Sequence, residues 1–228
     1  GQATPTLVVT SANTLNVDGT LTATVSTTAT YGRGGAITYE IVAGSGSATV
    51  NSTTGLVTGV SVGSVTLTVT AAGDTDYHTS TASQLITIGK ATPVLVVTSA
   101  NTLNVDGTLT ATVSSTATYG RGGAVTYAIV AGSGSATVNA TTGLITGVST
   151  GAVTLVATSA GDSNYNSTSA SQLITIGKTT PVLAITSANV ISVDGTLTAT
   201  VSSTATNGRG GVITYAIVAG SGSATVNA

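Results

Sequence analysis

The chain has 228 residues, of which 41% are hydrophobic and only 5% are charged, with a formal net charge of −2. Five basic residues cannot form the cationic surface that binding to nucleic acid requires, so we expect no nucleic-acid partner. Because there is no cysteine, the chain can form neither a disulfide nor a thiolate metal site. The hydrophobic runs are much shorter than the roughly 20 residues of a membrane helix, which predicts that no segment spans a bilayer.

Near copies of one sequence unit make up the chain. Pro5, Pro93 and Pro181 recur every 88 residues, and the first two copies are about four-fifths identical. A unit of this length is longer than a solenoid repeat and has the size of a small domain, so we expect tandem domains arranged head to tail. The predicted divisions are 1–2, the tail of a preceding repeat; 3–90, repeat 1; 91–178, repeat 2; and 179–228, an incomplete repeat 3.

The incomplete third copy has two interpretations. The sequence can be a window on a longer array, in which case repeat 3 continues beyond it. Alternatively, the chain can be a protomer whose third domain is completed by strands from a neighbouring subunit, as in strand addition to a sheet edge. The sequence leaves both open.

Each copy has the pattern of half-buried strands. Apolar residues alternate with Thr and Ser in short runs bounded by Gly, Asn and Asp. Asp18-Gly19 predicts a tight hairpin turn with a positive φ. Seven or eight strands in 88 residues predict an all-β fold, a β-sandwich. In repeat 1 the expected strands are Thr6–Thr10, Thr14–Val17, Thr20–Ser26, Ala36–Ala43, Ala48–Asn51, Leu56–Val60, Ser64–Ala71 and Gln84–Ile88.

Two motifs in each complete copy resemble those of a known family. Asn51-Ser-Thr-Thr-Gly-Leu-Val-Thr-Gly59 and the following Gly63-Ser-Val-Thr-Leu67 resemble the turn and strand of the bacterial immunoglobulin-like domains of surface adhesins. Gly73-Asp-Thr-Asp-Tyr77 and Gly161-Asp-Ser-Asn-Tyr165 are similar to a loop common in these repeats. The resemblance implies a β-sandwich that serves mostly as a spacer outside the cell. The core Trp and the disulfide of antibody domains are absent, so the resemblance is to the bacterial branch only.

The residue types for catalysis are scarce. His78 is the single histidine, and its counterpart in repeat 2 is Asn166, so we expect no catalytic triad, no zinc site and no enzyme activity. Asp74 and Asp76 are the candidate ligands for Ca²⁺. Calcium prefers six to eight oxygen ligands, and repeat 2 keeps only the first of these two carboxylates, so a turn-forming role is the default and no cofactor is expected.

The recurring charges suggest contacts between repeats. In an immunoglobulin-like sandwich, the Val-Asp-Gly turn lies at one end of the domain and the Gly-Arg-Gly-Gly loop at the other. A head-to-tail array would then place Asp18 opposite Arg121 and Asp106 opposite Arg209, and we expect these pairs to orient consecutive domains. Asp162, in the same domain as Arg121, is the competing partner. An exposed pair of this kind contributes at most about 1 kcal/mol.

We therefore expect a structural protein outside the cell or on its surface, a stalk or filament segment from an adhesin-type bacterial protein. Its partners would be neighbouring copies of the same repeat. One alternative is a subunit that exchanges strands with other chains in a filament. The other is a multivalent module that binds carbohydrate or a surface, for which Tyr31 and Tyr119 are the aromatic candidates.

Overall fold

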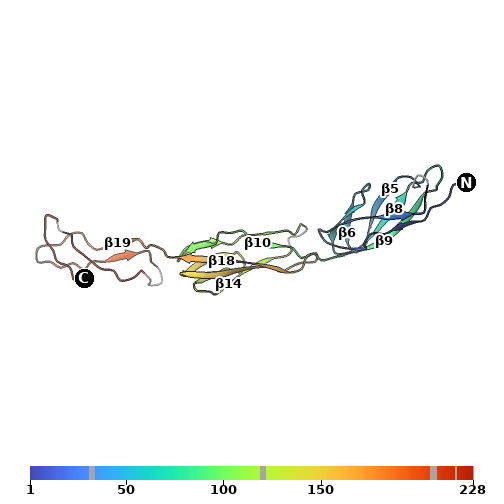
Figure 1. The fold of residues 1–228 in the computed structure, drawn as a ribbon. Helices are drawn as coiled ribbons and strands as arrows, with labels where there is room; N and C mark the ends of the chain where they lie inside the picture. Colours follow the sequence, from blue (N-terminus) through green and yellow to red (C-terminus); the bar gives the residue numbers. More distant parts are fainter. Residues whose placement is uncertain (31–33, 119–121, 206–209, 219, 228) are drawn as a thin grey trace.

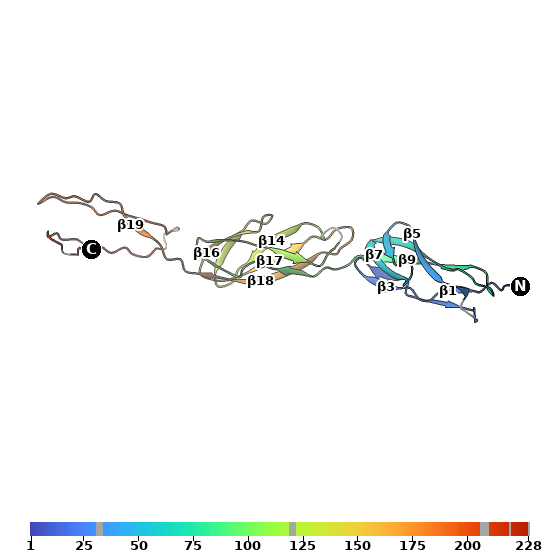
Figure 2. The ribbon, with the colours of Figure 1, turned by 90° about the horizontal axis from the view of Figure 1, so that it is seen from above.

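The three repeats follow one another along an extended chain, with the two termini at opposite ends (Figures 1 and 2). This computed structural model describes residues 1–228 except 31–33, 119–121, 206–209, 219 and 228. The described residues form strands and no α-helix, which confirms the all-β class expected from the alternating pattern.

Repeat 1 contains nine strands among its described residues, one more than the upper expectation. The additional strand arises because the expected strand Thr20–Ser26 is divided in two. The strands are β1 (Leu7–Val9), β2 (Thr14–Asn16), β3 (Thr20–Thr22), β4 (Val25–Thr27), β5 (Ile37–Ala43), β6 (Ser47–Val50), β7 (Leu56–Ser61), β8 (Gly63–Ala71) and β9 (Ser80–Gly89).

These strands form two principal sheets and one additional pair. One sheet has the order β2-β9-β8-β5, in which β2 and β9 run parallel and the other neighbours antiparallel. The other has the order β3-β7-β6, and β1 pairs with β4 separately. The division between β3 and β4 follows from this topology, because β3 pairs with β7 whereas β4 pairs with β1.

The core of repeat 1 lies between the sheets and is aliphatic. Along β8, Val65, Leu67 and Val69 are fully buried, while the Thr residues between them are half-buried. This alternation is the consequence of side chains pointing to opposite faces of a strand. Ile86 from β9 and Val57 from β7 complete the centre of the cluster.

The turn at Asp18-Gly19 differs from the expected hairpin. It joins β2 to β3, which lie in different sheets and do not pair with each other. The positive φ belongs to Asp18, at 61°, and not to the glycine. Asp tolerates the left-handed region because its short side chain can hydrogen-bond locally. Gly19 is required for another reason: a Cβ there would lie 2.9 Å from the carbonyl oxygen of Asn16.

Repeat 2 has the same architecture. Its sheets have the orders β11-β18-β17-β14 and β12-β16-β15, with the separate pair β10-β13. The strands are β10 (Leu95–Val97), β11 (Thr102–Asn104), β12 (Thr108–Thr110), β13 (Val113–Ser115), β14 (Val125–Val130), β15 (Ser135–Val138), β16 (Leu144–Ser149), β17 (Gly151–Ser159) and β18 (Thr168–Gly177).

Repeat 3 has only one strand pair among its described residues, β19 (Leu183–Ile185) with β20 (Val201–Ser203). This pair corresponds to β1-β4, which is the one pairing of repeat 1 contained within the first half of the sequence unit. Within the described residues, the counterparts of β2, β3, β5 and β6 form no strands. In repeat 1 those strands pair with β7, β8 and β9, all of which lie in the second half.

Candidate functional site

The contact between repeats 1 and 2 brings together turns from the facing ends of the two domains. Repeat 1 contributes the β2–β3 turn with Asp18 and the β7–β8 turn with Val62. Repeat 2 contributes Thr118, which follows β13, and the loop between β17 and β18 that carries Tyr165. We call this contact the repeat 1–2 junction.

The loop of Tyr165 is fixed by its own aspartate. Asp162 Oδ1 accepts hydrogen bonds from the backbone N–H groups of Asn164, at 2.7 Å, and Tyr165, at 2.9 Å. An aspartate that accepts bonds from the backbone two and three residues later closes an Asx turn, which holds the loop in one conformation. The turn thereby fixes the backbone from which the Tyr165 ring projects.

The centre of the junction is a bond between a phenol and a carboxylate. The hydroxyl of Tyr165 donates to Asp18 Oδ2 at 2.6 Å. The backbone N–H of Thr118 donates to the Tyr165 hydroxyl oxygen at 3.0 Å and to Asp18 Oδ2 at 3.3 Å. The Asp18 carboxylate, the Tyr165 hydroxyl and the Thr118 N–H are therefore all hydrogen-bonded to one another. Both donors to the negative charge of Asp18 come from repeat 2. Hydrogen bonds to a charged acceptor are about twice as strong as those between neutral groups.

Backbone groups add a second set of bonds around the linker. Asn164 Oδ1 accepts from the N–H of Val62 at 3.1 Å, and its carbonyl oxygen accepts from the N–H of Ala91 at 3.1 Å. The Lys90 ammonium donates to the carbonyl oxygen of Asp162 at 2.6 Å. The short linker is thus bound along the loop that carries Tyr165, which restricts rotation between the repeats.

Repeat 1 also buries the tyrosine ring. Tyr165 is 1% exposed and belongs to the hydrophobic cluster of repeat 1, together with Ala91 and Ala117 from repeat 2. Tyr77 occupies the same position in repeat 1 and is only half-buried, although its hydroxyl oxygen accepts the same kind of bond, from the N–H of Thr30 at 2.9 Å. The comparison indicates that the extra burial of Tyr165 comes from the facing domain.

The sequence identified Asp18 as a contact residue but not the partners that the structure gives it. Arg121, its expected partner, lies outside the described residues, so the Asp18–Arg121 pair stays a prediction. The competing residue, Asp162, uses its carboxylate in its own loop. Tyr165 entered the sequence analysis only as part of the Gly161-Asp-Ser-Asn-Tyr165 loop. The signal for its larger role was a tyrosine at the same position of both complete copies.

Asp106, the first member of the second expected pair, lies at the contact between repeats 2 and 3. Asp106 lines a cavity there, and Arg209 is outside the described residues. Asp106 has a φ of 63°, so its turn repeats the conformation of Asp18. The pairing of Asp106 with Arg209 stays a prediction.

The loop proposed for Ca²⁺ has a structural use for its first carboxylate. Asp74 Oδ1 accepts from the N–H of Asp76 at 2.8 Å and of Tyr77 at 2.9 Å, the same Asx turn as in repeat 2. Across the described part of the chain, no group of three or more His, Asp or Glu side chains could hold a metal ion. Calcium binding at this loop stays a prediction, and His78 is an exposed loop residue.

Comparison with known proteins identifies the first repeat. Residues 3–81 match the model of the bacterial Ig-like domain (group 2). This match confirms the resemblance drawn from the glycine-rich turn and the Gly-Asp loop. Among proteins with a curated description, none matches the chain. The described residues contain no helix that is both long enough and apolar enough to cross a membrane.

Several solved structures are similar at low identity. Fibronectin(III)-like modules of CbhA from Clostridium thermocellum are 14% identical, with a TM-score of 0.28, over 76% of this chain and 95% of theirs. The immunoglobulin domains 1–5 of Sidekick-1 are 13% identical, with a TM-score of 0.30, over 80% of this chain and 40% of theirs. The cadherin-like domains 1 to 4 of zebrafish RET are 13% identical, with a TM-score of 0.24, over 62% of this chain and 41% of theirs.

Proposed function

We propose that the chain is a non-enzymatic structural segment of a bacterial extracellular stalk, in which bacterial Ig-like repeats hold a distant domain away from the cell. The observation that carries the proposal is the repeat 1–2 junction. A spacer must resist bending between its domains. At the repeat 1–2 junction, the Tyr165–Asp18 bond and the buried Tyr165 ring both oppose such bending. The bound linker, Gly89-Lys-Ala-Thr-Pro93, further limits the freedom of the domains.

Mechanical and scattering measurements test this function. Small-angle scattering of the intact chain should give the distance distribution of a rod, with repeats 1 and 2 coaxial or at one fixed angle. Pulling the chain by its ends should release complete repeats one at a time. Each should lengthen the tether by roughly 290–320 Å less the length of the folded repeat, because 88 residues extend to about 3.3–3.6 Å each. A distribution of inter-repeat angles as wide as that of a flexible linker would contradict a stalk.

A second candidate function is a strand-exchanging filament subunit, and the surface of repeat 3 favours it. Val193 is 93% exposed, whereas its counterpart in repeat 1, Val17, is 1% exposed. A half sandwich of this kind would accept strands from another chain. Light scattering and electron microscopy over a range of concentrations distinguish the two functions, since a filament subunit would lengthen end to end whereas a stalk segment would stay monomeric.

The third alternative, multivalent binding of carbohydrate, has no specific observation in its favour. Tyr31 and Tyr119, its aromatic candidates, lie outside the described residues. It stays a prediction that a glycan array would test.

A further inference from the structure

The turn between β2 and β3 contains an Asp-Gly step, the kind of backbone step at which aspartate isomerises most readily. The glycine nitrogen can attack the side-chain carboxyl carbon of the preceding aspartate, and glycine has no Cβ to hinder the approach. The chain's Asp-Gly steps all lie at this one position of the repeat, at Asp18, Asp106 and Asp194. Its other aspartates precede Thr, Tyr or Ser, whose side chains hinder the same attack.

The fold needs both residues of the Asp18-Gly19 step. A Cβ on residue 19 would lie 2.9 Å from the carbonyl oxygen of Asn16, which disfavours any larger residue there. Asp18 has a φ of 61°, and its carboxylate accepts the hydrogen bonds from Tyr165 and Thr118 at the repeat 1–2 junction. The residues that build the turn and the junction therefore also create a site of chemical modification.

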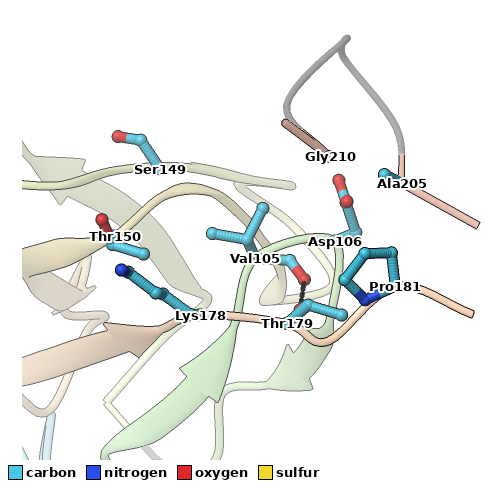
Figure 3. A pocket seen from close by; sticks show the side chains of 9 residues that line it. All are labelled: Val105, Asp106, Ser149, Thr150, Lys178, Thr179, Pro181, Ala205 and Gly210. Carbon is cyan, nitrogen blue, oxygen red and sulfur yellow. Dashed lines mark hydrogen bonds between the residues drawn. The ribbon is translucent and has the colours of Figure 1, made fainter. Parts of the chain in front are cut away.

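The three Asp-Gly turns have the same local conformation. The aspartate φ is 61°, 63° and 58°, and in each turn the glycine N–H donates to the carbonyl oxygen three residues earlier, at 2.9, 3.0 and 2.9 Å. Figure 3 shows the second turn, with the side chain of Asp106 projecting from it. Asp18 is half-buried, whereas Asp106 and Asp194 are exposed. A difference in reactivity at Asp18 should therefore come from its contact with repeat 2 and not from the turn.

Docking of repeat 2 holds the group that has to move. Attack requires the carboxyl carbon of Asp18 to swing over the Gly19 nitrogen, whose N–H must also leave the carbonyl oxygen of Asn16. The Tyr165 hydroxyl, at 2.6 Å, and the Thr118 N–H, at 3.3 Å, both bind Asp18 Oδ2. Rotation of the side chain would break both bonds at once, so the reaction has to wait until repeat 2 undocks.

We propose that Asp18 is a site of isoaspartate formation that is protected while repeats 1 and 2 are docked and reacts once they separate. The Gly19 nitrogen bonds to Cγ of Asp18, and the carboxyl hydroxyl leaves as water with the amide proton. Water then adds to the main-chain carbonyl carbon of the resulting succinimide and breaks the bond between this carbon and the nitrogen. The chain now runs through the former side chain, with no net change in atoms or charge.

The product cannot rebuild the junction. An isoaspartyl residue lengthens the backbone of the turn by one methylene group and brings the carboxylate closer to the chain by the same amount. The bond between Gly19 and Asn16 that closes the turn and the position of the acceptor for Tyr165 are both lost. A separation of the repeats that outlasts the reaction therefore becomes permanent. The reaction depends on the repeat 1–2 junction and not on what the array holds or carries.

The test ages the intact chain in warm neutral buffer and measures isoaspartate at each Asp-Gly step. Cleavage after the five Lys and Arg residues places Asp18, Asp106 and Asp194 in separate peptides, 1–33, 91–121 and 179–209, each with no other acidic residue. Labelling by isoaspartyl methyltransferase, or fragmentation that distinguishes isoaspartyl from aspartyl peptides, gives the rate for each. The exposed Asp194 supplies the rate of an unprotected step in the same sample.

We expect Asp18 to isomerise at least about tenfold more slowly than Asp194 in the parent chain. Tyr165→Phe should raise the Asp18 rate about tenfold, because the loss of one hydrogen bond to a charged acceptor raises the undocked fraction by about this factor. The rate at Asp194 should stay the same. Tyr77→Phe, which removes the matching hydroxyl from repeat 1, should change neither rate.

The consequence for docking is read from spin labels at Thr49→Cys and Thr137→Cys, exposed positions at the same place in repeats 1 and 2. In aged Tyr165→Phe, the distance distribution should broaden further in proportion to the isoaspartate at Asp18. Isoaspartyl methyltransferase returns isoaspartate to the succinimide and so to aspartate. Treatment with this enzyme should therefore reverse the part of the broadening that came with ageing.

Three results would overturn the inference. Asp18 could isomerise as fast as Asp194 in a parent chain whose Thr49–Thr137 distribution is narrow, so that docking gives no protection. Tyr165→Phe could leave the Asp18 rate unchanged, which would assign the protection to the turn itself. The isomerised chain could keep its distribution, so that the junction tolerates the product. A broad distribution in the unaged parent chain is a different failure, because it contradicts the docked junction and with it the proposed stalk.

Discussion

Replacing Tyr165 by Phe removes the central bond of the repeat 1–2 junction while keeping the ring. The lost hydroxyl donates to a carboxylate at 2.6 Å, and hydrogen bonds to charged groups contribute about 1.5–3 kcal/mol. The N–H of Thr118 already lies 3.3 Å from the same oxygen, so it can shift to satisfy part of the charge of Asp18. We therefore expect the lower end of this range, about 1.5 kcal/mol, which is an increase of roughly tenfold in the undocked fraction.

The assay is the distance distribution between spin labels at Thr49→Cys and Thr137→Cys, which occupy equivalent positions in repeats 1 and 2. Tyr165→Phe should broaden this distribution and leave the core of each repeat intact, as measured by amide exchange. Asp18→Asn should have about half the effect, because Asn keeps an acceptor oxygen and tolerates a φ of 61°. The double variant should lose less docking free energy than the sum of the losses of the two single variants, since both changes remove the same bond.

Tyr77→Phe is the matched control. It removes the same hydroxyl from the same loop of repeat 1, where its bond is to Thr30 and not to the facing domain of repeat 2. It should leave the Thr49–Thr137 distribution unchanged. Two results would show that the Tyr165 hydroxyl bond does not orient the two repeats. The Thr49–Thr137 distance distribution of Tyr165→Phe could be as narrow as that of the parent chain, or Tyr77→Phe could broaden it equally.

Three further predictions concern the stability of single repeats, read by thermal unfolding. Ser80 has a buried hydroxyl without a hydrogen-bond partner, so Ser80→Ala should stabilise repeat 1 by about 1 kcal/mol and raise its unfolding temperature by several degrees. Gly123 has a φ of 88°, and a Cβ there would lie 2.1 Å from the carbonyl oxygen of Gly161. Gly123→Ala should therefore destabilise repeat 2 by at least about 2 kcal/mol. An unchanged midpoint of thermal unfolding would contradict the close approach of these loops. Leu155→Ala should cost about 2.5–5 kcal/mol because the side chain is fully buried, whereas Leu173→Ala, at a position 60% exposed, should change stability by less than about 1 kcal/mol.

Much of the fold could be predicted from sequence because the repeat shows the strand pattern twice. The alternation of Val and Leu with Thr in Ser64–Ala71 predicts β8, and the structure buries those apolar residues. The division of Thr20–Ser26 was missed because its alternation is unbroken, and only the pairing of its two ends with different strands separates β3 from β4. The local residue pattern of a strand does not show which distant strand it pairs with.

The junction was harder to predict for a related reason. Because charged residues are few in this chain, the prediction paired Asp18 with an opposite charge, Arg121. A neutral phenol can also donate to a carboxylate, and the Asx turn of Asp162 fixes the backbone from which the Tyr165 ring projects. The residue types alone do not indicate that Tyr165 reaches Asp18, because the contact depends on where the loop places the side chain.

The position of the tyrosine couples the folding of a repeat to its docking. Tyr165 lies between β17 and β18, which pair along nine residues and form the centre of repeat 2. The loop exists in its docking conformation only when these two strands are paired, whereas the receiving turn with Asp18 needs the β2–β9 and β3–β7 pairings of the preceding repeat. A junction therefore forms only between two complete repeats. In a growing array, this dependence would make each new junction wait for the last strands of the later repeat, so that an unfinished domain stays mobile relative to the rod until its core is closed.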